Sequence, residues 1–419
     1  MAAGIEAMNV CAGTACVDVR ELAKHRGLDM RRFANLLMRE KSVALPSEDP
    51  VTYGVNAARP IVERLSASER GRIELLITCS ESGIDFSKSL STYIHHYLGL
   101  SRHCRLFEIK QACYAGTAGL QMAVNLILAQ TSPGARALVV ATDLTRTAVP
   151  EGMDVGSQDW AYAEPSSGAG AVALLVGPDP VVFRIDAGAQ GYYGYEVMDT
   201  CRPAPDEETG DAELSLLSYL DCCEQTFRNY QTRVSEVDYA RTFEYLAFHA
   251  PFGGMVRGAH RMMMRKVTGA AAVEIEKDFE RRVMPGLVYC QRVGNIMSAM
   301  VLLSLASTID NIAPAPARIG CFSYGSGCCA EFYSGTTTAA ARNRQSDFAI
   351  ARQLDARHSL TIAEYESILR ANVAMRFGTR DLTVSVPVGL RFNPTAATGQ
   401  QRLALTRIRN FHREYEWQS

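Results

Sequence analysis

The chain has 419 residues, with 43 Lys and Arg against 45 Asp and Glu and a formal net charge of −2. That length can bury a large core, and the near balance of charges argues against nucleic acid as a general partner. No signal-like segment opens the chain, no apolar run reaches the length of a membrane span, and none of the 12 cysteines forms a C-x-x-C pair. We expect a cytoplasmic protein with reduced thiols, no nucleic-acid or membrane partner and no metal site.

Eight apolar segments are predicted as strands, and most are apolar on both faces, as in a sheet that helices cover. In chain order they are RIELLITCS, RLFEIKQ, ARALVVATD, AGAVALLVG, VVFRIDAGA, FEYLAFHA, ARIGCFSYG and CCAEFYSG. Helices are predicted at 53–66, 114–130, 213–232, 256–268, 272–283 and 295–311. This arrangement favours an α/β layered fold, in which the acidic segment RPAPDEETGDAE is a long loop near the middle.

The same spacing occurs twice along the chain. Cys113 opens one predicted helix and Asn295 opens another, and each stands equally far before a strand that begins with Ala-Arg. Glu81 and His249 stand at the ends of two other predicted strands. Two copies of one α/β unit that face each other would bring these four side chains to strand ends and helix starts, where sites form in open α/β sheets.

Cys113 is the candidate nucleophile. A thiol at a helix N-terminus lies near unpaired N–H groups and the positive end of the helix dipole, and we expect both to favour the thiolate. A small buried hydrophobic role is the commoner one for any single cysteine, and a lone histidine such as His249 is often a satisfied core residue. Together, a cysteine nucleophile and a distant histidine are the arrangement expected of covalent acyl transfer.

Six segments, in this order, resemble successive motifs of the 3-hydroxy-3-methylglutaryl-CoA synthase family: SESGIDFSKS, KQACYAGTAGLQ, AEPSSGAGAVALL, FHAPF, VGNIMSAMVLLSLAS and FSYGSG. The opening GIEAMNVCAGTACVDVRELAKHRGLD and the ending LTRIRNFHREYEW resemble the two ends of that family. The resemblance implies a thiolase-like fold of two duplicated, pseudo-symmetric halves in α/β/α/β/α layers. It divides the chain into residues 1–178 and 179–419, the latter with a family-specific C-terminal segment, and it implies a homodimer.

The resemblance also implies roles for the matched residues. Cys113 would accept an acetyl group from a thioester, and Glu81 would remove a proton from its methyl group and later protonate the new alkoxide. His249 would hold the ketone oxygen of the acceptor. The implied substrate-binding residues are Asn295, which would bind the acceptor thioester, Ser326 and Tyr114. A carboxylate with this task needs a poorly solvated pocket that raises its pKa.

One departure from the family concerns the nucleotide end of CoA. Family members that use acetyl-CoA carry two lysines for its phosphates where this chain has Gly254 and Gly258. Arg257, Arg261 and Arg265 instead form one stripe of a predicted helix, either a solvated basic face or a landing site for an acidic acyl-carrier protein. This pattern resembles the synthases of polyketide β-branching, which take acetyl from a donor carrier protein and add it to a β-ketoacyl chain on an acceptor carrier domain. No permanent cofactor is implied, because a phosphopantetheine arm, or CoA, carries the substrate.

Alternatives remain open on the sequence alone. The first is a metabolic synthase that uses acetyl-CoA and acetoacetyl-CoA, and the second is a non-catalytic thiolase-fold scaffold that binds carrier proteins. A ketoacyl synthase of the initiating type would share Cys, His and Asn but would not need Glu81. The choice between acetyl and propionyl donors, the acceptor chain and the polyketide are not determined by the sequence.

Overall fold

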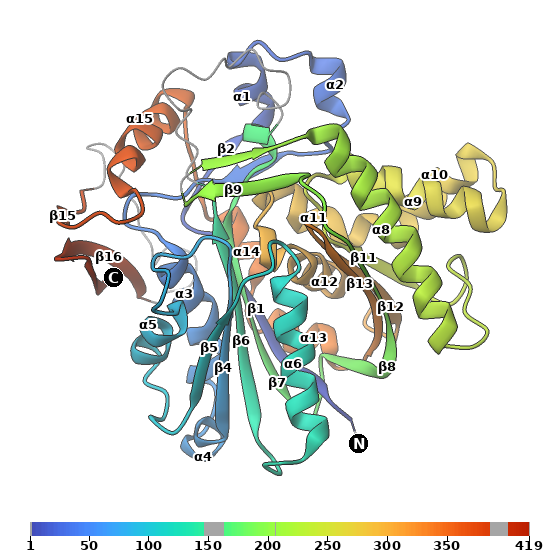
Figure 1. Cartoon of the computed structure of the whole chain (residues 1–419), viewed down its shortest axis with the longest axis horizontal. Coiled ribbons are helices and arrows are strands. Elements are labelled where there is room, and N and C mark those ends of the chain that lie inside the picture. Colours follow the sequence, from blue (N-terminus) through green and yellow to red (C-terminus); the bar gives the residue numbers. More distant parts are fainter. Residues whose placement is uncertain (1, 146–162, 206, 386–400, 419) are drawn as a thin grey trace.

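The computed structural model describes residues 2–145, 163–205, 207–385 and 401–418. Among these residues the largest element is a nine-stranded sheet in the order β11-β12-β13-β8-β1-β7-β6-β4-β5 (Figure 1). Its strands are β1 (Gly4–Cys11), β4 (Ile73–Cys79), β5 (Arg105–Ile109), β6 (Arg136–Leu144), β7 (Ala169–Gly177), β8 (Phe183–Gly194), β11 (Tyr245–Phe248), β12 (Arg318–Gly325) and β13 (Cys329–Thr337).

Smaller sheets and the helices surround this sheet. The short strands are β2 (Ala15–Asp18), β3 (Glu40–Ser42), β9 (Thr200–Ala204), β10 (Glu207–Gly210), β14 (His358–Ser359), β15 (Leu382–Thr383), β16 (Arg402–Arg409) and β17 (His412–Gln418). The helices are α1 (Val19–His25), α2 (Met30–Ala34), α3 (Pro50–Glu63), α4 (Ala67–Gly71), α5 (Leu90–Tyr97), α6 (Ala115–Ala129), α8 (Ala212–Arg233), α9 (Gly253–Thr268), α10 (Ala272–Arg282), α11 (Met284–Val293), η1 (Met297–Ala299), α12 (Met300–Asn311), α13 (Ala341–Ser346), α14 (Ile350–Asp355), α15 (Ile362–Asn372) and η2 (Val373–Met375).

The strand pairing confirms the predicted duplication. In one half β4 runs parallel to β6, β6 antiparallel to β7, and β7 antiparallel to β1. In the other half β11 runs parallel to β12, β12 antiparallel to β13, and β13 antiparallel to β8. Strands in matching places therefore follow the same chain order, and β5 extends the first half alone. The predicted boundary at residue 178 falls between β7 and β8, and the division into two domains stays a prediction.

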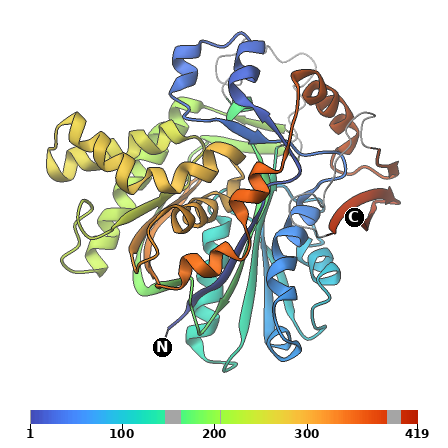
Figure 2. The same ribbon diagram turned by 180° about the vertical axis from the view of Figure 1, so that it is seen from behind.

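Helices and sheet halves form five layers, as predicted. In the middle, α6 packs through Gly119 against Val139 of β6, and Gln121 of the same helix donates to Glu331 of β13 at 2.9 Å. Helix α3 covers the other face of the first half, and α8 covers the other face of the second half, where Tyr230 and Ser334 are hydrogen-bonded. Strand β1, the last strand of the first half, pairs with β8 of the second half and so joins the two halves into one sheet (Figures 1 and 2).

Two expectations need correction. Ala112–Ala129, which contains α6, is a stretch of the described residues long and apolar enough to span a membrane by length and composition. A core helix passes the same test, and the contacts of α6 with both halves place it in the core. The segment predicted as a loop instead forms the hairpin β9–β10, in which Thr209 pairs with Cys201. The sequence did not predict this pairing, because the segment is rich in proline, glycine and acidic residues, which are uncommon in strands.

Candidate active site

Cys113, the candidate nucleophile, lies on a tightly held turn between β5 and α6. Ala112 has a φ of 44°, and Cys113 follows it two residues before α6 begins. At the end of β12, a Cβ on Gly325 would lie 2.7 Å from two backbone atoms of this turn, so only glycine allows the close approach. A Cβ on Gly116 would overlap the carbonyl oxygen of Ser298. The two halves therefore clamp the turn that presents the thiol.

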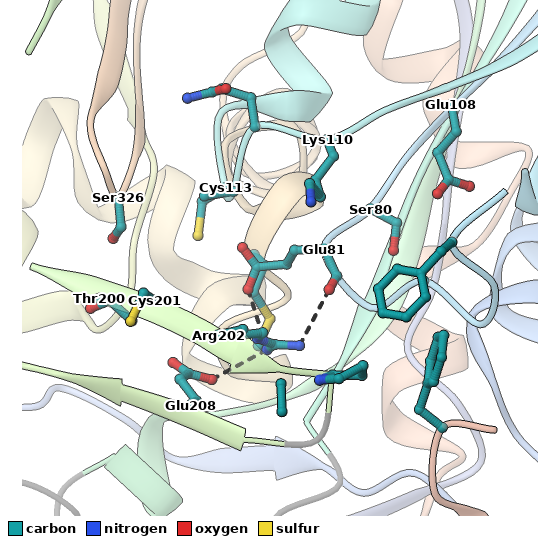
Figure 3. A pocket seen from close by; sticks show the side chains of 18 of the residues that line it. Ser80, Glu81, Glu108, Lys110, Cys113, Thr200, Cys201, Arg202, Glu208 and Ser326 are labelled. Carbon is teal, nitrogen blue, oxygen red and sulfur yellow. Dashed lines mark hydrogen bonds and ion pairs between the residues drawn. The ribbon is translucent and has the colours of Figure 1, made fainter. Parts of the chain in front are cut away.

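Cys113 lines a pocket of about 930 Å³, a size typical of ligand sites (Figure 3). The structure brings four other predicted residues to the same pocket: Glu81, His249, Asn295 and Ser326. Tyr114 is not part of its lining, because the Tyr114 hydroxyl donates to the carboxylate of Glu331 at 2.6 Å. Direct substrate binding by Tyr114 remains a prediction, and this placement does not support it.

Glu81 follows β4 and points into the pocket beside an arginine. Its Oε1 lies 3.3 Å from Nη2 of Arg202, which in turn lies 3.2 Å from Glu208. Burial raises the pKa of Glu81 to about 8, while Arg202 opposes this shift and Asp143 adds to it. The carboxyl group can therefore exchange a proton near neutral pH, as a general acid/base must.

Asp143 holds this part of the site together from the end of β6. Its Oδ1 accepts hydrogen bonds from the backbone N–H groups of Glu81 at 2.9 Å and Ser82 at 3.0 Å. Its Oδ2 accepts the backbone N–H of Ser298 at 3.0 Å, at the start of the segment that leads to α12. This fully buried carboxylate thus connects the turn that contains Glu81, in the first half, with the segment that leads to α12, in the second half. Its signal in the sequence is an aspartate at the end of an otherwise apolar strand.

The expectation of a thiolate at Cys113 is wrong. Burial raises the pKa of the Cys113 thiol well above its usual range, the negative charges of Glu81 and Asp143 raise it further, and Arg202 opposes them. Removal from water and two nearby carboxylates outweigh the dipole of a helix that begins only at Ala115. Cys113 is therefore a thiol at rest, and any reaction in which it acts as a nucleophile requires it to lose this proton.

His249 and Asn295 supply polar groups from the second half. The backbone of His249 is held by a bond from its N–H to Phe322 at 2.7 Å and by one from the Tyr219 hydroxyl to its carbonyl oxygen at 2.6 Å. Burial lowers the pKa of its imidazole to about 3, so the ring is neutral and carries one N–H donor. The Oδ1 of Asn295 accepts the N–H of Met297 at 3.0 Å, which orients the side-chain amide.

Hairpin β9–β10 contributes a group that the sequence did not reveal. Its pocket-lining residues are Thr200, Cys201, Arg202, Pro203, Ala204, Pro205 and Glu208. Figure 3 shows the Cys113 thiol and the Glu81 carboxyl group facing each other, with Arg202 on the far side of Glu81. In the sequence, Arg202 is only one arginine within an acidic, proline-containing segment. No pattern in the sequence indicated that this segment folds back onto the turn after β4, which contains Glu81.

The predicted basic stripe lies on α9, outside the pocket. Arg257 and Arg261 both bind the carboxylate of Glu276 on α10, at 2.5 and 2.6 Å, and Arg265 is exposed. At the start of α9, a Cβ on Gly254 would overlap the carbonyl oxygen of Asn35. The space around Gly258 is open. The packing of α9 on the segment after α2 therefore excludes any side chain at position 254.

Comparison with known proteins gives consistent matches. Residues 1–181 match the N-terminal model, and residues 260–383 the C-terminal model, of hydroxymethylglutaryl-coenzyme A synthase. The chain is 63% identical, over 100% of its length and 99% of the relative, to the polyketide biosynthesis 3-hydroxy-3-methylglutaryl-ACP synthase PksG of Bacillus subtilis (strain 168). It is 32% identical, over 88% of its length and 91% of the relative, to the hydroxymethylglutaryl-CoA synthase of Enterococcus faecalis.

Solved structures give the same result. The HMG synthase of the curacin biosynthetic pathway, in complex with apo donor-ACP, superposes with a TM-score of 0.94 at 59% identity, and both chains are covered fully. MvaS in complex with 3-hydroxy-3-methylglutaryl coenzyme A superposes with a TM-score of 0.84 at 29% identity, over 100% of this chain and 99% of that one. The chain belongs to the hydroxymethylglutaryl-coenzyme A synthase family, and its structure is the family's thiolase-like fold.

Proposed function

We propose that this protein is an acyltransferase of polyketide biosynthesis that moves an acetyl or propionyl group from a donor acyl-carrier protein onto Cys113. It then adds that group to the β-ketone of a chain on an acceptor carrier domain and releases a β-branched, hydroxymethylglutaryl-like thioester. The observation that carries this proposal is the pairing of a cysteine and a carboxyl group of raised pKa in one pocket. Acyl transfer alone needs only the cysteine, whereas condensation at an acetyl methyl group needs the base as well.

In the first step the Cys113 sulfur attacks the thioester carbonyl of the donor. The new S–C bond replaces the bond to the pantetheine sulfur, which leaves and takes up the proton that Cys113 loses. Both bonds are thioesters, so the acyl group stays activated for the next step. Because the pKa of Cys113 is raised, the thiolate that attacks forms only as the thiol gives up its proton in this step.

In the second step the Glu81 carboxylate removes a proton from the carbon next to the Cys113 thioester. The resulting carbanion attacks the ketone of the acceptor, whose oxygen accepts a hydrogen bond from the neutral ring of His249. Glu81 then returns its proton to the alkoxide that forms. Asn295, with its amide oriented by Met297, binds the carbonyl of the acceptor thioester. Water finally cleaves the bond to Cys113 and frees the enzyme.

Two observations support a carrier protein rather than free CoA as the donor. Asn35 leaves no space for a phosphate-binding lysine at position 254, and α9 carries three arginines that an acidic partner can approach. Two relatives of high identity bear names that include an acyl-carrier protein. The phosphopantetheine arm of the carrier is then the substrate carrier. We further propose a homodimer that works in the cytoplasm, where its free cysteines stay reduced.

The test is a comparison of transfer rates onto Cys113 from acetyl-loaded donor carrier protein and from acetyl-CoA at equal concentrations. We expect the carrier protein to react faster and its reaction to slow with added salt, because surface attraction is screened. Peptide mass spectrometry locates the acetyl group. A clear preference for acetyl-CoA would return this chain to the metabolic alternative, and acetylation elsewhere would remove Cys113 from its role.

A further inference from the structure

Arg202 occupies a position that acyl transfer and condensation do not require. Its guanidinium group lies 3.3 Å from the Glu81 carboxylate and 3.2 Å from Glu208, and it also donates to the backbone oxygen of Glu81 at 3.4 Å. Its side chain is 20% exposed, so these ion pairs are partly desolvated. An arginine beside a general base lowers the pKa of that base and so weakens it. The position of Arg202 beside Glu81 therefore needs an explanation other than support of the base.

The release step changes where negative charge lies in the pocket. Before release the charge is on Glu81, and the product is bound to Cys113 as a neutral thioester. Glu81 takes one proton from water, the water oxygen bonds to the thioester carbon, and the C–S bond breaks with its electron pair on sulfur. The sulfur then takes the proton of the new carboxylic acid. Glu81 and Cys113 end protonated, and the product ends as a carboxylate, so one negative charge has moved from Glu81 to the product.

We propose that Arg202 is a catalytic residue of this hydrolysis, the cation that passes its ion pair from Glu81 to the product carboxylate as that carboxylate forms. This inference rests on the proposed function, because only an acyl group on Cys113 generates a carboxylate at this place. Figure 3 shows the arrangement that it needs, with the Cys113 thiol and Arg202 on two sides of the Glu81 carboxyl group.

The geometry around Arg202 suits such an exchange. A guanidinium group has five donors and keeps its charge at every working pH, so it can leave one carboxylate for another without changing its own state. Glu208, one strand away on the same hairpin, stays in contact with Arg202 and limits how far it can move. The pocket thus keeps a positive charge beside the carboxylate that gives up its negative charge during release, and preorganised charges of this kind stabilise transition states.

The experiment separates release from the steps before it. Cys113 is loaded with acetyl from a small synthetic acetyl-pantetheine thioester, and intact-protein mass spectrometry follows both loading and spontaneous loss of acetyl. We expect Arg202→Gln to slow the loss by about 10²–10³-fold, the usual effect of removing one donor to a developing oxyanion, and to slow loading far less. Arg202→Lys, which keeps the charge, should fall between Arg202→Gln and the wild type. Glu207→Gln, which removes an exposed charge from the same hairpin, should behave as the wild type.

The assay pH must be chosen so that Arg202→Gln does not act indirectly, by changing the ionisation of Glu81. Removing Arg202 raises the pKa of Glu81, so the comparison is made on the alkaline plateau of the loss reaction, where Glu81 is ionised in all variants. A defect that disappears there, or one that slows loading and loss equally, would overturn the proposal. Equal defects in Glu207→Gln and Arg202→Gln would overturn it too. If the wild type accepts no acetyl from any carrier protein yet Arg202→Gln still slows the loss, the carrier-protein donor of the proposed function fails, while the role of Arg202 in releasing an acyl group from Cys113 stands.

Discussion

Glu81 is the residue whose surroundings determine the pH at which the site can work. Burial raises its pKa to about 8 against the opposing charge of Arg202. In the proposed reaction the carboxylate form of Glu81 removes the proton from the acetyl group, and the population of this form rises with pH through its pKa. At neutral pH only a minority of Glu81 is ionised, but the desolvation that raises its pKa also makes the ionised carboxylate a stronger base.

The condensation rate should accordingly rise with pH. With acetyl already on Cys113, the single-turnover rate should increase up to a plateau above pH 8 and fall about tenfold per pH unit below it, because the ionised fraction of Glu81 falls by that factor. The measurement is a pH profile of product formation. A rate that stays flat between about pH 6 and pH 9 would show that another group is the base.

Replacing Glu81 should separate the two chemical steps. Glu81→Gln should still accept acetyl on Cys113, because that transfer forms no carbanion, while condensation should fall by about 10²–10⁴-fold. Separate assays of loading and of product formation provide the measurement. An equal loss in both would mean that Glu81 only shapes the pocket.

Glu331 should make stability depend on pH. Burial raises its pKa to about 7, so the folded state binds a proton that the unfolded state releases at lower pH. Stability is then highest below the unfolded pKa and falls as pH rises through the folded one, by about 1 kcal/mol between pH 6 and pH 8. Urea unfolding at these two pH values should show a smaller difference for Glu331→Gln. An unchanged difference would assign the effect to other groups.

At the scale of single residues, the sequence indicated which groups meet and not how they ionise. Cys113, Glu81 and His249 were identified because strand ends and motifs mark them. The protonated state of Cys113 could not be predicted, because it depends on desolvation and on Asp143, which lies in another strand. Arg202 was missed for a similar reason: its importance comes from a fold-back of the chain that no local pattern encodes.

At the scale of elements, α9 combines a packing constraint with a charged face. Its first turn fits against the segment after α2 only because residue 254 has no side chain, while Gly258 faces open space. Gly254→Ala should therefore destabilise the protein by about 1–3 kcal/mol through overpacking, and Gly258→Ala should stabilise it by about 0.5–1 kcal/mol through helix propensity. Urea unfolding of the two variants checks this. The reverse order would mean that α9 does not pack as described.

The same helix should influence transfer from the carrier protein. Each exposed ion pair contributes only about 0.2–1 kcal/mol, so we expect a large effect only when Arg257, Arg261 and Arg265 are all changed to Glu. That variant should slow transfer from the carrier by tenfold or more and change transfer from acetyl-CoA much less.

The matched control for the arginines is Glu276→Gln. It frees Arg257 and Arg261 from their shared partner and should speed carrier transfer and steepen its dependence on salt. If both variants leave the carrier reaction unchanged, the stripe is an ordinary solvated face. The sequence predicted α9 and its arginines, but it could not show that Glu276 on α10 already neutralises part of their charge.

At the scale of the whole molecule, the duplication organises the site. The equal spacings before the two Ala-Arg strands predicted it, and the matching pairings of β4, β6, β7 and β1 with β11, β12, β13 and β8 confirm it. Long apolar strands and helices were predictable because burial imposes a regular pattern on them. Strand β1 and hairpin β9–β10 were not predicted, since the latter is held by contacts with a distant turn rather than by its own composition.

The most direct test of the whole account is the product formed on the acceptor. Donor carrier protein loaded with acetyl and acceptor carrier domain loaded with acetoacetyl are mixed with the enzyme, and the acceptor is analysed by intact-protein mass spectrometry. The account predicts that the acceptor gains the mass of a 3-hydroxy-3-methylglutaryl group in place of acetoacetyl, and that Cys113→Ala forms none. An acceptor that keeps only acetoacetyl while Cys113 becomes acetylated, or a Cys113→Ala enzyme that still forms product, would contradict it.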